Sequence, residues 1–74
     1  MLTVKINNQE ELVNVLSMLD SEEFILAEID NNRGYAIFDL YYDSETDKFS
    51  LFDKCDIEFE SLDDMERHLI REYL

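Results

Sequence analysis

The stretch from Phe24 to Glu60 reads FILAEIDNNRGYAIFDLYYDSETDKFSLFDKCDIEFE and decides the fold. Apolar and polar residues alternate along it in successive runs, and short polar turns separate the runs. This pattern is typical of antiparallel strands that follow one another along the chain. We therefore predict strands over residues 24–30, 35–43 and 48–53, and a short extended segment over residues 55–60.

The turn at residues 31–34, Asn-Asn-Arg-Gly, sets the register of the first hairpin. Gly34 suits the left-handed position that closes a type I turn. This turn places Ala27 opposite Phe38, and the inward pairs are then all apolar. The other face of the hairpin carries Phe24, Leu26, Tyr35, Ile37 and Tyr41 among Glu28, Asp30, Asp39 and Asp43. An apolar patch rimmed by acids is a surface to which a partner or a second copy would bind.

The segments that flank this stretch predict one more strand and two helices. Residues 2–6 alternate with period two, and residues 8–20 place apolar side chains at helical spacing behind an Asn8 cap. Ser61 caps a similar pattern that runs to the end of the sequence. We predict a single compact acidic domain over residues 1–74 with an α+β fold. Its element order is β-α-β-β-β-(β)-α, and two helices pack on one face of a mainly antiparallel sheet.

The composition is strongly acidic. Asp and Glu number 19 and Lys and Arg number 6, which gives a formal net charge of −13 over 74 residues. This sign opposes direct binding to nucleic acid, whose phosphates require cations, and to anionic membrane surfaces. It favours a basic partner. A second interpretation stays open, in which the acidity only keeps a small protein soluble.

The sequence also predicts where the protein works. Cys55 is the single cysteine, so no internal disulfide can form and a reducing compartment is expected. The first residues contain neither a basic leader nor a long apolar run. We therefore expect a cytoplasmic protein.

No motif for catalysis, a cofactor or a metal ion is complete. The acids of Asp43–Asp47 resemble the start of a calcium loop, but Lys48 and Lys54 occupy the positions that need glycine and glutamate. Cys55 and His68 are the only residues of their types, and a zinc site commonly needs four such ligands. A chain with one glycine cannot build a phosphate-binding loop. We predict a protein that is not an enzyme and that uses no cofactor or metal.

One arrangement of acids points to a function. Asp56, Glu58 and Glu60 project from the same side of an extended segment, and two residues of strand span ~6.6–6.8 Å. Nucleic-acid phosphates rise ~3.4 Å per nucleotide along the axis and lie farther apart along the winding backbone, so a row of strand carboxylates approximates a row of phosphates. The alternative is an edge strand that its charges protect from aggregation. The predicted partner-binding residues are Asp39, Tyr41, Asp43, Glu45, Asp47, Asp56, Glu58 and Glu60.

In size, acidity and α/β pattern the chain is similar in general character to DNA-mimic inhibitors of phages and mobile elements, which include anti-restriction and anti-CRISPR proteins. The resemblance covers composition and architecture, matches no motif residue by residue and assigns no site. It implies a non-enzymatic inhibitor that occupies the basic groove of a nucleic-acid-binding protein. The alternative is a small structural or regulatory interaction module, either a monomer or a homodimer through the exposed sheet face.

Overall fold

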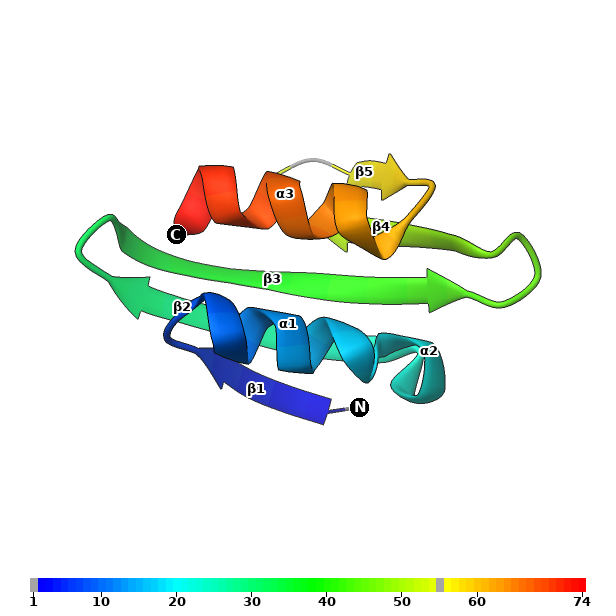
Figure 1. The fold of residues 1–74 in the computed structure, drawn as a ribbon, viewed down its shortest axis with the longest axis horizontal. Coiled ribbons are helices and arrows are strands. Elements are labelled where there is room, and N and C mark those ends of the chain that lie inside the picture. Colours follow the sequence, from blue (N-terminus) through cyan, green and yellow to red (C-terminus); the bar gives the residue numbers. More distant parts are fainter. Residues whose placement is uncertain (1, 55) are drawn as a thin grey trace.

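The computed structural model describes residues 2–54 and 56–74 and shows an α+β domain with one sheet (Figure 1). The five strands run in chain order across the sheet. The strands are β1 (Leu2–Ile6), β2 (Phe24–Asn31), β3 (Gly34–Asp43), β4 (Lys48–Phe52) and β5 (Asp56–Phe59). The helices are α1 (Gln9–Ser17), α2 (Leu19–Glu22) and α3 (Leu62–Tyr73).

The strand pairing confirms the predicted fold class and supplies the strand order that the sequence left open. β1 pairs with β2 in parallel, and every later strand pairs with its predecessor in antiparallel fashion. A parallel pair needs a long crossover, and α1 with α2 forms that crossover between β1 and β2. The short extended segment predicted after residue 54 is an edge strand, β5, paired with β4.

The first hairpin has the predicted register. Ala27 pairs with Phe38, and Asn31 pairs with Gly34 across the turn. Gly34 has a φ of 125°, a backbone conformation that L-residues with side chains rarely adopt. The turn is further fixed by the backbone N–H of Arg33, which donates to Oδ1 of Asn31 at 2.8 Å. The prediction of a positive φ at Gly34 is therefore confirmed.

Replacing Gly34 by alanine is expected to destabilise the fold by about 1 kcal/mol. No heavy atom lies within 4 Å of the position that a Cβ would take, so the cost arises from the backbone conformation and not from a clash. Chemical denaturation of Gly34→Ala and of Asn32→Ala measures the effect, because Asn32 is exposed in the same turn and has no positive φ. Equal stability of Gly34→Ala and wild type would show that the backbone conformation at residue 34 does not require glycine.

The first helix begins as predicted but ends earlier. Oδ1 of Asn8 accepts the backbone N–H of Glu11 at 2.9 Å, which caps the first turn. One helix was expected to continue to about residue 20, whereas α1 ends at Ser17 and the short helix α2 follows. At Met18 the backbone N–H donates to the carbonyl of Val15 at 3.1 Å, a tighter turn than an α-helical one. The change of path keeps Leu19 fully buried.

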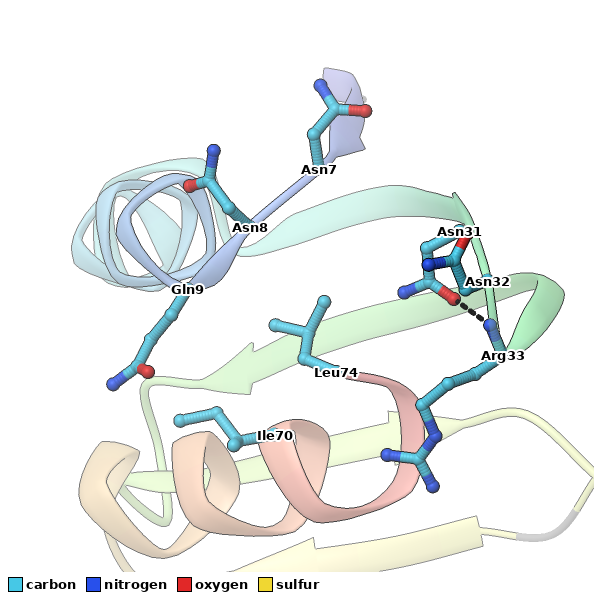
Figure 2. Close-up of a pocket in the computed structure, with 8 residues that line it drawn as sticks. All are labelled: Asn7, Asn8, Gln9, Asn31, Asn32, Arg33, Ile70 and Leu74. Carbon is cyan, nitrogen blue, oxygen red and sulfur yellow. Dashed lines mark hydrogen bonds between the residues drawn. The ribbon is translucent and has the colours of Figure 1, made fainter.

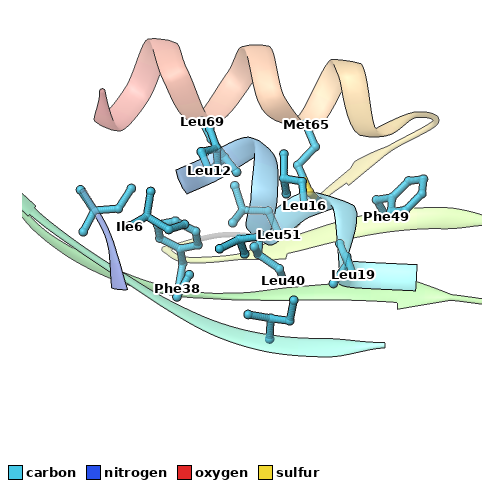
Figure 3. Close-up of a cluster of buried hydrophobic side chains, with 14 residues drawn as sticks. Ile6, Leu12, Leu16, Leu19, Phe38, Leu40, Phe49, Leu51, Met65 and Leu69 are labelled. Carbon is cyan, nitrogen blue, oxygen red and sulfur yellow. The ribbon is translucent and has the colours of Figure 1, made fainter. Parts of the chain in front are cut away.

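The core lies on one side of the sheet only. α1 and α3 cover the same face, as predicted (Figure 1), and their apolar side chains meet those of the strands in a single cluster (Figure 3). Leu12 and Leu16 of α1, Met65 and Leu69 of α3, and Leu40 of β3 are almost completely buried in it. None of the helices in the described part of the chain is both long and apolar enough to cross a membrane.

No described element covers the other face of the sheet, which we call the open face. Its residues alternate with those of the core along each strand. They are Thr3 and Lys5 of β1, Phe24, Leu26, Glu28 and Asp30 of β2, Tyr35, Ile37, Asp39, Tyr41 and Asp43 of β3, Lys48, Ser50 and Phe52 of β4, and Asp56 and Glu58 of β5.

Candidate functional site: the open sheet face

The open face has an apolar centre. Ile37 and Tyr35 are 51% and 60% exposed, and four further apolar side chains of this face are half-buried. Those four are Phe24, Leu26, Tyr41 and Phe52. Sequence reasoning predicted this patch but missed Phe52. The signal was present in the alternation of β4, because Phe49 and Leu51 point into the core and the next residue must point outward.

Acids lie beside apolar or small residues across the strands of the open face. Asp39 pairs with Phe52, which pairs with Asp56 on the edge strand. In the next row Tyr41 pairs with Ser50, which pairs with Glu58. The structure therefore brings five of the predicted partner-binding residues onto one face, spread over β3 and β5. These are Asp39, Tyr41, Asp43, Asp56 and Glu58.

The remaining three predicted residues lie outside the strands that form the face. Glu45 and Asp47 belong to the turn between β3 and β4, and Asp47 has a φ of 59°. The Asp47 carboxylate accepts the hydroxyl of Tyr42 at 2.7 Å, and Tyr42 points to the helix side of the sheet. Glu60 follows the end of β5. The acids of the open face thus lie in rows that run across the strands, and Asp47 of the turn is directed to the helix side instead.

Lys48 introduces a cation that sequence reasoning did not place. Its Nζ lies 3.5 Å from a carboxylate oxygen of Glu58 and 3.6 Å from one of Glu60. The charges of Glu60 and then of Glu58 raise the pKa of Lys48 above its usual value. Exposed ion pairs of this kind contribute little to stability. They do, however, neutralise part of the acid row at the β5 edge.

Two tyrosine hydroxyls donate to carboxylates, one on each side of the sheet. Tyr35 donates to Glu28 at 2.8 Å across the first hairpin, and Tyr42 donates to Asp47. Each hydrogen bond requires the protonated phenol, and it is the main cause that raises the pKa of each tyrosine above 10.0. Both contacts are lost when the phenols ionise.

Alkaline solution is expected to destabilise the protein. The raised pKa values of Tyr35, Tyr42 and Lys48 mean that the folded state holds these protons more tightly than the unfolded state. The stability that they contribute is complete below the unfolded values of 10.0 and 10.5 and is lost as pH rises through the raised folded values. Thermal melts at about pH 9 and pH 11 should show a lower Tm at the higher pH.

The double variant Tyr35→Phe and Tyr42→Phe is the control for this prediction. It lacks both phenol protons, so its Tm should fall less between the two pH values than that of the wild type. An equal fall in both proteins would show that the two hydrogen bonds do not contribute to the pH dependence.

The described residues offer no metal centre. Among residues 2–54 and 56–74, no three His, Cys, Asp or Glu side chains come together in a way that could hold an ion. The imidazole of His68 packs against the ring of Phe59, with 5.3 Å between the ring centroids. Cys55, which was weighed together with His68 as a zinc ligand, lies outside the described residues.

The residues drawn in Figure 2 line a concave region of the molecule. This hollow of about 530 Å³ lies between the start of α1, the β2–β3 turn and the end of α3, and is lined by Asn7, Asn8, Gln9, Asn31, Asn32, Arg33, Ile70 and Leu74. Most of its polar groups already have partners: Asn31 donates to the carbonyl of Tyr73 at 2.8 Å, and Arg33 donates to that of Arg71 at 3.0 Å. These bonds tie the hairpin to α3, which makes the hollow a structural junction.

Comparison of the chain with protein-family models, with curated proteins and with solved structures finds no match.

Proposed function

We propose that this protein is a non-enzymatic inhibitor that uses its open face to occupy the basic nucleic-acid-binding groove of a target protein. The carrying observation is the row structure of the face, in which Asp39, Asp56 and Glu58 lie on strands of fixed register. A sheet holds its carboxylates at set spacings, as a nucleic-acid backbone holds its phosphates. The net charge of −13 extends the same negative field around the whole molecule.

The spacing of the acids supports this proposal. Asp56 and Glu58 are two residues apart on β5, a separation of ~6.6–6.8 Å along an extended chain. Asp39 lies two strands away from Asp56 in the same row, and adjacent strands are ~4.7–4.9 Å apart. The face thus presents carboxylates in two directions, as one side of a duplex presents phosphates of both strands.

The charges of the open face argue against a homodimer through it. In such a dimer each copy would contribute only two cations from this face, Lys5 and Lys48, and a larger number of acids. These acids are Glu28, Asp30, Asp39, Asp43, Asp56 and Glu58. Juxtaposed like charges at an interface cost several kcal/mol. The apolar centre is therefore better matched by a partner whose own rim is basic. A structural or regulatory module with such a partner is the second candidate function.

Affinity capture separates the two candidates. The immobilised protein should retain nucleic-acid-binding proteins from a cell extract at low salt, and both high salt and added duplex DNA should release them, because the same basic groove serves both ligands. Retained proteins that DNA does not displace would contradict mimicry and support the interaction module.

A further inference from the structure

Asp39 has an unusual position on the open face. It lies in the middle of β3, the central strand, with Leu26 opposite on β2 and Phe52 opposite on β4. Its neighbours on the same face along β3 are Ile37 and Tyr41. All four are apolar or aromatic, so a half-buried carboxylate stands inside an apolar ring.

This carboxylate has no partner among the residues that the structure describes. Within the described residues, Asp39 makes neither an ion pair nor a side-chain hydrogen bond. The two lysines of the open face lie beside other acids. Lys5 is opposite Glu28 in the strand register, and Lys48 contacts Glu58 and Glu60. A carboxylate among apolar side chains gains more from a cation than one surrounded by water, since the local dielectric constant is lower.

One of the aromatic neighbours of Asp39, Tyr41, packs against a further ring. The ring of Tyr41 makes an edge contact with that of Phe24, with 6.3 Å between centroids and 64° between planes. Ser50, the residue opposite Tyr41 on β4, is small. Tyr41 on the same strand and Phe52 on the neighbouring strand therefore place aromatic side chains next to Asp39 in two directions.

We infer that Asp39, with Tyr41 and Phe52, forms a binding site for the guanidinium group of an arginine on the partner. A guanidinium donates two parallel hydrogen bonds to one carboxylate, and its planar faces stack on aromatic rings. A lysine ammonium is a compact and strongly hydrated point charge. It has no planar face to stack on the aromatic rings and no fork of two parallel N–H groups for the carboxylate. The inference deepens the proposed function and rests on it, because arginine is common in grooves that bind phosphates.

Two short peptides test the site without the natural partner. Lys-Gly-Arg-Gly-Lys and Lys-Gly-Lys-Gly-Lys have the same charge and differ at one residue, and NMR titration of the labelled protein measures both affinities. The arginine peptide should bind about fivefold more tightly, with the largest shifts at the amides of residues 39, 41 and 52. Asp39→Asn, which keeps the side-chain shape, should remove this preference.

Matched variants complete the test. Asp63→Asn removes an exposed acid from α3 and should leave the arginine preference unchanged. Tyr41→Leu keeps the carboxylate but removes one ring, and should reduce the preference even if Asp39→Asn failed to fold. Equal affinities of the two peptides for the wild-type protein, or equal effects of Asp39→Asn and Asp63→Asn, would overturn the site. If the preference holds while DNA displaces no captured protein, the arginine site stands and the proposed function fails.

Discussion

Neutralising Asp43, Asp56 and Glu58 together is expected to weaken binding of the target protein by about tenfold to a hundredfold, which corresponds to about 1.4–2.8 kcal/mol. The triple variant Asp43→Asn, Asp56→Asn and Glu58→Gln removes charge from both margins of the open face but leaves its apolar centre intact. It also leaves Lys48 with fewer acidic neighbours, since Asp43 lies opposite this lysine and Glu58 contacts it. The cation would then repel a basic partner.

A second triple variant with the same change in net charge serves as the control. Glu10, Asp20 and Glu22 are exposed on α1 and α2, away from the open face. Their replacement by Gln, Asn and Gln should reduce affinity much less than the change on the open face. Titration calorimetry against a captured target compares the two, after thermal melts have shown that both variants fold. Equal losses would mean that only the overall charge attracts the partner.

Replacing Leu40 by alanine is expected to cost about 2–5 kcal/mol of stability. Leu40 is 0% exposed at the centre of β3, where it pairs with Ile25 on one side and Leu51 on the other. A domain of 74 residues has a total stability of about 4–11 kcal/mol, so this cavity would remove a large part of it. Urea denaturation monitored by circular dichroism measures the loss.

Ile37→Ala is the matched control for the core substitution. Ile37 lies on the same strand but on the open face, and it is 51% exposed. The loss of apolar contact on folding should be smaller there, and the stability should change by less than about 1 kcal/mol. Similar losses from both substitutions would show that the open face is covered in solution, for example by a second copy.

Local patterns carried most of the fold prediction. The Asn31–Gly34 turn and the alternation on each side of it determine the hairpin register, because a slip by one residue would turn every inward side chain outward. The parallel pairing of β1 with β2 was not predicted, since alternation in Leu2–Ile6 shows which side chains are buried but not which strand lies beside them. The break at Met18 also depends on tertiary packing, which keeps Leu19 in the core.

The candidate site was predictable only in part. Alternation alone assigned Asp39, Tyr41, Asp56 and Glu58 to outward positions, and the structure places them on one face. The ion pairs of Lys48 and the apolar ring around Asp39 depend on the register between strands distant in sequence. A single strand carries no information about such neighbours, and only the order of β2, β3 and β4 reveals them.

Competition between this protein and nucleic acid for one target tests the central claim most directly. A fluorescently labelled duplex is bound to a captured nucleic-acid-binding protein, and this protein, without a label, is titrated in while anisotropy is recorded. Mimicry predicts that the duplex is released completely and that no ternary complex forms, with an inhibition constant equal to the directly measured Kd. A stable complex containing target, duplex and this protein together would contradict the account.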